Sequence, residues 1–273
     1  MEPSVSDRPA SSAPPLPTPV WQACGDTGLM LDLGGLKPGF HDILCAVDDK
    51  SVLTEKARLL AQQIHDLCVK GTITGITDIT PGLTSLVIQY DPALIRASHL
   101  KQWITPLISA DVAPQQDEVK IWQLPVCYAD EFAPDLAEIS ERTGLSCENI
   151  IQLHTSTIHH VAIMGFLPGL GYMTGLNEAL YLPRRANPRI AVARGSVGIA
   201  MDQTVIYPLD SPGGWNLIGR MPYYLFRPEA DTPLLFSAGD RVKFTAIDKL
   251  EFEACAARAQ AGEIPSFTTE QAG

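Results

Sequence analysis

Two adjacent arginines carry the clearest binding chemistry in this sequence. Arg184 and Arg185 directly follow Pro183, and a planar guanidinium can bind a carboxylate or a phosphate through two parallel hydrogen bonds. Arg189 and Arg220 are weaker candidates of the same kind. A salt bridge on the surface of an acidic protein would explain the pair as well. The sequence therefore leaves both an anion-binding role and a structural role open.

A second candidate group lies on the run QTVIY, residues 203–207. Side chains alternate along a strand, so positions 203, 205 and 207 share one face. Gln203 could hydrogen-bond an amide, and Tyr207 could donate a hydrogen bond to a developing oxyanion. Alternatively, both are polar groups of the core whose partners are backbone atoms.

Histidines supply the candidate general base. His154 lies at the end of an expected helix, where it could accept a proton from a substrate. The structural alternative is a protonated imidazole that interacts with the helix dipole. His159 and His160 are neighbours, so on a strand they face opposite sides and cannot bind one metal ion together. We expect no metal site in this chain.

The glycine-rich run GFLPGLGYMTGL, residues 165–176, does not meet the requirements of a nucleotide loop. No lysine follows Gly175, although a Walker-type loop needs one, and Thr174 takes the place of the last glycine of a dinucleotide fingerprint. The Pro-Gly pair in its middle instead predicts a turn that connects strands. Phe166 and Tyr172 would then lie along a groove that faces substrate, unless the segment is plain turn architecture.

The run SPGGW, residues 211–215, places two glycines before a large aromatic residue. Gly213 and Gly214 would let backbone N–H groups approach a ligand closely. A tight turn with Trp215 in the core of a barrel is the structural alternative. If Trp215 is exposed, this region instead suits a buried contact with another protein.

Composition limits the partners and the compartment. The chain has 273 residues, 45% of them hydrophobic, and a formal net charge of -11. This acidic balance disfavours nucleic acid and anionic membranes as partners, and no apolar run reaches the length of a membrane span. Six scattered cysteines without metal-ligand spacing predict reduced thiols in a cytoplasmic protein.

The N-terminal half is expected to contain a tail and one domain. Residues 1–19 are rich in Pro, Ser and Ala, which predicts a disordered tail and not a secretory signal. Residues 20–108 show the order β-α-β-β-α, which predicts an α+β, ferredoxin-like α/β sandwich. Pro81-Gly82 marks its hairpin. The first helix should bury Leu53, Ala57, Leu60, Ile64 and Leu67 and end at Gly71. The second helix should bury Leu100, Trp103, Ile104 and Leu107.

The C-terminal half is expected to form a barrel. Residues 109–118 are polar and predict a linker. Residues 119–250 begin with a strand and two short helices, the first ended by Gly144 and the second capped by Ser146. Short β-rich runs separated by Pro and Gly then indicate a barrel or sandwich. Residues 251–273 predict a C-terminal helix and tail.

Two longer runs carry a family resemblance: HTSTIHHVAIMGFLPGLGYM (154–173) and LPRRANPRIAVARGSVGIAMDQTVIYPLDSPGGWNLIGRMP (182–222). They resemble the family of 5-oxoprolinase B subunits, also described as allophanate hydrolase subunit 1, as the Kip-type kinase inhibitor and as the carboxyltransferase C/D subdomain. The resemblance covers roughly residues 21–250 and implies a ferredoxin-like domain followed by a cyclophilin-like β-barrel. Met201 and Val205 depart from it, because they stand near positions where the family favours glycine.

The resemblance also implies a function. It indicates a hydrolase subunit that is active only within a complex. With partner subunits A and C, and with ATP, this complex would cleave 5-oxoproline to L-glutamate. The ATP site could lie on a partner subunit. A sensor histidine kinase inhibitor and an allophanate or urea carboxyl-transfer subunit are the alternatives. The catalytic candidates are Gln203, Tyr207 and His154; the substrate-binding candidates are Arg185, Arg184, Phe166, Tyr172, Gly213 and Gly214.

Overall fold

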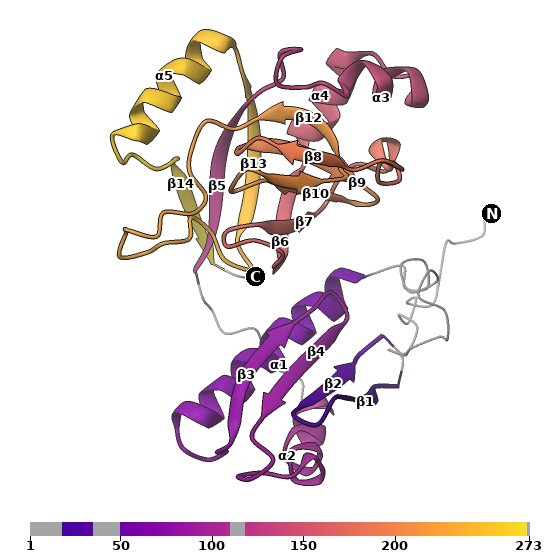
Figure 1. Ribbon diagram of the computed structural model, residues 1–273, viewed down its shortest axis with the longest axis vertical. Coiled ribbons are helices and arrows are strands. Elements are labelled where there is room, and N and C mark those ends of the chain that lie inside the picture. Colours follow the sequence, from indigo (N-terminus) through magenta and orange to yellow (C-terminus); the bar gives the residue numbers. More distant parts are fainter. Residues whose placement is uncertain (1–17, 35–49, 110–117, 272–273) are drawn as a thin grey trace, which may run out of the picture.

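The computed structural model describes residues 18–34, 50–109 and 118–271. Most of the predicted tail and linker, and Cys45, lie outside these residues. Figure 1 shows two units, an N-terminal sheet with helices and a C-terminal barrel. The five described cysteines are all free thiols. No helix within the described ranges is both long and apolar enough to cross a membrane.

The N-terminal unit contains a four-stranded antiparallel sheet in the order β1-β2-β4-β3. The edge strand β1 forms a hairpin with β2, so the chain order is β-β-α-β-β-α and not the predicted β-α-β-β-α. Mixed α and β structure is thus confirmed, whereas the ferredoxin-like type stays a prediction. The elements are β1 (Val20–Cys24), β2 (Gly28–Asp32), α1 (Lys50–Val69), β3 (Ile76–Pro81), β4 (Ser85–Tyr90) and α2 (Ala97–Ser109).

The helices of this unit bury most of the predicted apolar stripes. In α1, Leu53 and Ile64 are almost fully buried, and Gly71 beyond its end has a φ of 71°. In α2 the prediction for Trp103 was wrong, because its side chain is 48% exposed. Ile108 completes the buried stripe of Leu100 and Ile104 instead, since residues four apart lie on one helix face.

Seven strands close a barrel in the order β12-β9-β10-β7-β6-β13-β5, with β12 paired back to β5. Strands β13 and β5 are parallel, and the other barrel pairs are antiparallel. The predicted barrel is therefore confirmed. Its strands are β5 (Glu118–Cys127), β6 (Ile158–Met164), β7 (Gly171–Thr174), β9 (Ser196–Ala200), β10 (Gln203–Ile206), β12 (Asn216–Arg220) and β13 (Arg241–Ile247).

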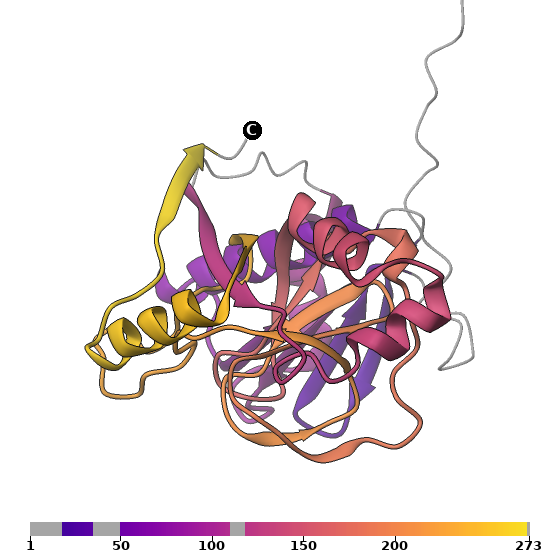
Figure 2. The same ribbon diagram turned by 90° about the horizontal axis from the view of Figure 1, so that it is seen from above.

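Further elements surround the barrel. Helices α3 (Leu136–Thr143) and α4 (Cys147–Ser156) lie on one side and α5 (Lys249–Gln260) on the other (Figures 1 and 2). Strands β8 (Arg189–Val192) and β11 (Ser211–Gly213) form a separate two-stranded ribbon. Strand β14 (Phe267–Gln271) pairs with β5, so the predicted tail contains a strand that extends the barrel sheet.

The barrel strands carry apolar side chains on both faces. Because side chains alternate along β10, Thr204 and Ile206 face the interior, whereas Val205 and Tyr207 face outward. Every residue of β9 is buried, as expected for a strand that is covered on both sides. The outward side chains form a second small core, the outer cluster, which consists of Leu170, Val192, Ala200, Val205, Tyr207, Trp215 and Leu217.

Candidate functional site

An aromatic and basic group lies on the outer cluster. The ring centroids of Tyr172 and Trp215 are 6.0 Å apart, and the guanidinium of Arg184 lies 5.4 Å from the Trp215 ring centroid. Tyr207 belongs to the same cluster. Gln203 begins β10 with a half-buried side chain and, by alternation, shares the outward face of Tyr207. These five residues are called the outer site.

Tyr207 is held as a neutral phenol. Its side chain is 2% exposed, and burial raises its pKa to about 12. The backbone N–H of Trp215 donates to the phenol oxygen, and this oxygen lies against Gly213 of β11. The phenol therefore packs within the outer cluster, with almost no surface exposed to solvent.

Gly213 is needed at this site for space and not for its backbone freedom. A Cβ at Gly213 would clash with the phenol oxygen of Tyr207, so only glycine lets β11 approach this ring. Neither Gly213 nor Gly214 has a positive φ, and the approach of their backbone N–H groups to a ligand stays a prediction. The carbonyl of Gly214 accepts a hydrogen bond of 2.7 Å from the backbone of Arg185 and is thereby occupied.

Arg185 is engaged by carboxylates of this chain. Its Nη1 donates to Asp135 Oδ1 at 2.8 Å and to Glu138 Oε2 at 3.0 Å. Arg189 donates to the same oxygen of Asp135. Of the two adjacent arginines, Arg185 thus has the structural role that the sequence left open. Arg184 is exposed and forms no ion pair within the described part of the chain.

Asp135 organises this region, although sequence reasoning missed it. Its side chain is 3% exposed, and its Oδ2 accepts a hydrogen bond of 2.6 Å from the backbone N–H of Leu217. Asp135 precedes α3 as an N-cap residue but makes no side-chain cap. The sequence carries no signal for these contacts, because the arginine partners lie 50 and 54 residues away.

His154 lies inside the barrel, apart from the outer site. It is fully buried, its Nδ1 shares a hydrogen bond of 2.8 Å with Tyr128, and its ring stacks on Phe244. Burial, and then the charge of His159, holds the pKa of His154 well below its usual value. The ring is therefore neutral, which corrects the helix-dipole interpretation. Because solvent does not reach it, the structure offers no path from His154 to a substrate.

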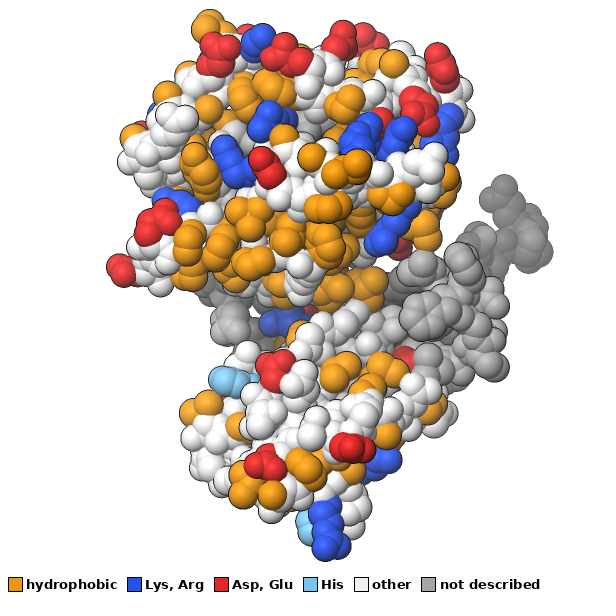
Figure 3. All heavy atoms as spheres, in the orientation of Figure 1, with side chains coloured by type: hydrophobic (Ala, Val, Ile, Leu, Met, Phe, Trp, Pro, Cys, Tyr) orange, Lys and Arg blue, Asp and Glu red, His pale blue; other side chains and the backbone are white. Residues whose placement is uncertain are grey.

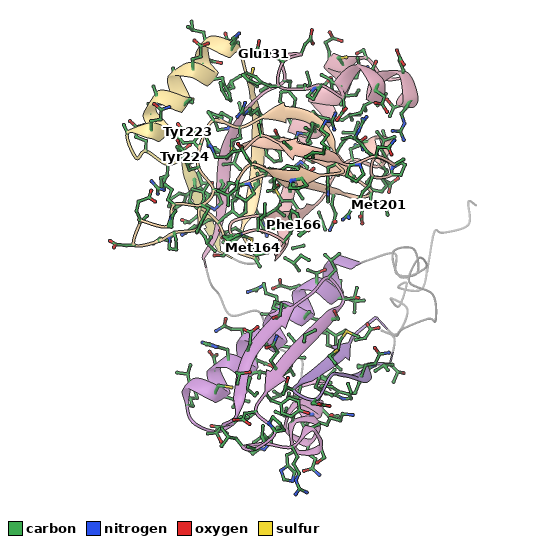
Figure 4. The ribbon with its side chains drawn as sticks, viewed as in Figure 1. Glu131, Met164, Phe166, Met201, Tyr223 and Tyr224 are labelled. Carbon is green, nitrogen blue, oxygen red and sulfur yellow. The ribbon has the colours of Figure 1, made fainter. Side chains whose placement is uncertain are left out.

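Phe166 lies on the predicted turn between β6 and β7, which the structure confirms. Its side chain is 67% exposed and its φ is 68°, an uncommon backbone conformation for an aromatic residue. Figure 4 places Phe166 at the edge of the barrel that faces the N-terminal unit. Phe166 therefore does not join Tyr172 in one groove, because only Tyr172 packs on the outer cluster.

The described residues contain no cluster of His, Cys, Asp and Glu that could hold a metal ion. A hollow of about 500 Å³ lies beside α5, lined by Tyr223, Cys255 and Arg258 among others. It shares no residue with the outer site.

The structure is a closed barrel with a buried phenol and, among the described residues, an arginine without an ion-pair partner on its outer face. The sequence matches the family described as carboxyltransferase domain, subdomain C and D, over residues 37–236. The chain belongs to this family. The family resemblance that the sequence motifs indicated is thereby confirmed.

Individual relatives agree with this assignment. The chain is 38% identical over 191 residues to the B subunit of 5-oxoprolinase from Bacillus subtilis (strain 168), an alignment that covers 66% of this chain and 79% of that protein. The crystal structure of TTHA0988 has a TM-score of 0.65 at 31% identity, over 81% of this chain and 40% of that one. This chain thus corresponds to less than half of that protein. The K. lactis urea amidolyase, at TM-score 0.69 and 19% identity over 93% of this chain and 16% of that one, shares the fold.

Proposed function

We propose that this chain is the B subunit of a 5-oxoprolinase complex, which opens the lactam ring of 5-oxoproline to L-glutamate with hydrolysis of ATP. The observation that carries the proposal is the 38% identity to the B subunit of a 5-oxoprolinase, 79% of which is covered. The outer site supports it, because it offers groups for each polar part of this substrate. We also propose that subunits A and C complete the enzyme.

Arg184 is proposed to bind the substrate carboxylate. Its exposed guanidinium lies near the Trp215 ring and has no carboxylate partner in the described chain, so it is free to form a charge-assisted pair. Tyr207 is the proposed donor to the lactam carbonyl, whose oxygen gains negative charge during attack; Gly213 covers its hydroxyl in this structure, so β11 must shift for the two to meet. Gln203 can hydrogen-bond the lactam amide from the same face. The cleaved bond is the ring C–N bond, and water supplies the new carboxylate oxygen.

The nucleotide is proposed to bind to another component of the complex. In this chain residues 165–170 of the glycine-rich run join β6 to β7, whereas a phosphate cradle joins a strand to a helix N-terminus. The run also has no lysine. It therefore does not fit ATP, and the residues of this chain are left to bind and orient the amino-acid substrate.

The test is glutamate release from 5-oxoproline by the reconstituted complex of all three proteins with ATP. Arg184→Ala should lower kcat/KM on the order of 10- to 100-fold, the effect of losing a contact worth about 1.5–3 kcal/mol. Arg184→Lys should restore only part of it, since lysine lacks the fork. Arg96→Ala, which removes an exposed arginine before α2, is the matched control.

The outcomes separate the alternatives. Wild-type turnover by Arg184→Ala would remove Arg184 from the site. A wild-type complex that releases no glutamate would overturn the function itself. Slowed autophosphorylation of a sensor kinase, or turnover of allophanate, would then identify which alternative replaces it.

A further inference from the structure

The hollow of about 500 Å³ beside α5 is built against the outer face of the barrel. Leu124 of β5 and Phe244 of β13 belong to the barrel core, so by alternation the odd-numbered residues of both strands face outward. Strands β5 and β13 pair in parallel, which places these outward residues side by side. They form the floor of the hollow, which consists of Gln123, Pro125, Thr245 and Ile247.

The size and the lining of the hollow suit a small molecule. Small-molecule sites measure about 300–1,000 Å³ and combine an apolar lining with a few polar groups. Pro125, Ile247 and Ala254 supply the apolar part here. Most of the lining lies beyond residue 236, where the family match ends. The hollow is also separate from the outer site, where Trp215 is only 6% exposed and so does not offer the protein contact expected of an exposed side chain.

Helix α5 presents one charge of each sign to the hollow. Glu251 and Arg258 both line it, and both are exposed. They are seven residues apart in the sequence, so they lie on one face of the helix, about 10 Å apart along its axis. Figure 3 shows acidic and basic side chains beside hydrophobic ones over α5, at the upper left. The hollow therefore has an acidic end and a basic end.

Arg258 keeps hydrogen-bond donors for a ligand. Its Nη2 donates to the Cys255 thiol at 3.0 Å, and Tyr223 also hydrogen-bonds to Arg258. The carboxylate of Glu263 lies 3.8 Å from Nε, which is beyond hydrogen-bond distance. Because a guanidinium has five N–H donors, these contacts leave donors for a charge-assisted pair with a carboxylate.

Glu251 keeps an acceptor oxygen for a cation. Its Oε2 accepts a hydrogen bond of 3.3 Å from the backbone N–H of Asp248, as part of the capping box that begins α5. This bond holds the carboxylate at the N-terminal end of the helix. A carboxylate has two acceptor oxygens, so the second oxygen is left for an ammonium group.

We propose that the hollow binds a small zwitterion whose carboxylate pairs with Arg258 and whose ammonium group pairs with Glu251. Side chains on one helix face lean in the same direction, so the two charged ends lie about 10 Å apart, like their backbone positions. After about 3 Å for each hydrogen bond, about 5 Å remain between the charged groups of the ligand. An ammonium group and a carboxylate separated by three carbons, as in glutamate, meet this spacing. 5-Oxoproline does not, because its nitrogen is an uncharged lactam.

The test titrates the full chain with L-glutamate by isothermal calorimetry. Arg258→Gln and Glu251→Gln should each weaken binding on the order of 10- to 100-fold, because each removes a charge-assisted hydrogen bond. Glutamine at position 251 retains the capping acceptor, so α5 stays folded. The matched controls are Arg142→Gln on α3 and Glu253→Gln on α5, both exposed and outside the hollow; they should bind like the wild type.

Two further ligands test the need for both charges. Glutarate has the two carboxylates of glutamate but no ammonium group, and 5-oxoproline has a carboxylate and a lactam nitrogen. Each lacks the partner of Glu251, so each should bind about tenfold more weakly than L-glutamate or worse. Equal affinity for glutarate would overturn the inference, and so would a wild-type chain that does not bind L-glutamate at millimolar concentration.

Steric blocking locates the binding. Ala254 is exposed on the α5 side of the hollow, so Ala254→Phe should fill the hollow and abolish binding. Ala257→Phe, on the same helix but outside the hollow, should bind like the wild type. Wild-type affinity of Ala254→Phe would overturn the inference.

The outer site is tested separately, because L-glutamate is also the product of the proposed reaction. Arg184→Ala should leave the affinity for L-glutamate at the hollow unchanged. Loss of binding in Arg184→Ala would assign the bound glutamate to the outer site and overturn the inference. The inference does not rest on the proposed function, since the chain is titrated alone and no turnover is measured.

Discussion

Asp135→Asn should destabilise the barrel unit more than any surface change of similar size. Asp135 accepts hydrogen bonds from Leu217 N, Arg185 and Arg189, and its side chain is 3% exposed. Asparagine has the same shape but only one acceptor oxygen. Its amide N–H would therefore face a donor, either the Leu217 N–H or a guanidinium. Breaking a buried charged network in this way costs about 3–5 kcal/mol.

The loss of stability converts into a measurable shift of Tm. For a domain of this size each kcal/mol lowers Tm by about 2–4 °C, so the expected drop is about 6–20 °C. The control is Glu138→Gln, because Glu138 also contacts Arg185 but is 49% exposed and should contribute less than about 1 kcal/mol. Thermal unfolding followed by near-ultraviolet circular dichroism measures both. A Tm of Asp135→Asn within a degree or so of Glu138→Gln would refute the reasoning.

Two further predictions concern the barrel interior and the outer site. Burial lowers the pKa of His159 to about 4, so the unfolded chain binds more protons than the folded chain below pH 6.5. The stability that depends on neutral His159 is then fully present above that pH and should fall by about 2 kcal/mol between pH 7 and pH 5. Urea midpoints should show a shallower pH slope for His159→Asn than for the wild type. Gly213→Ala should displace the Tyr207 ring and lower glutamate release at least as much as Tyr207→Phe, whereas Gly214→Ala, whose Cβ would make ordinary contacts, should retain activity. Equal activity of the two alanine variants would contradict the packing role of Gly213.

The local signals in the sequence predicted much of the fold. Helices α1 and α4 follow from apolar spacing, from Gly71 and from the Ser146 cap, which accepts a hydrogen bond from Asn149 N at 3.2 Å. The Pro81-Gly82 hairpin and the 165–170 turn follow from turn chemistry. These features depend on residues close in sequence, which is why periodicity and turn residues reveal them. The residues from PRR (183–185) to GWNLIGR (214–220) were enough to indicate the family.

The tertiary structure decided which candidate residues meet. Sequence could not distinguish Arg184 from Arg185, because the carboxylates that occupy Arg185 come from α3 and the residue before it. Nor could it show that His154 faces the barrel interior while Tyr207 faces outward, because the register of closure determines both. Pairing between distant residues leaves no periodic trace in one sequence. The sequence therefore showed which residue types could carry chemistry, because that information is local. The packing of the closed barrel decided whether each of these side chains lies in the core, in an ion pair or at the site.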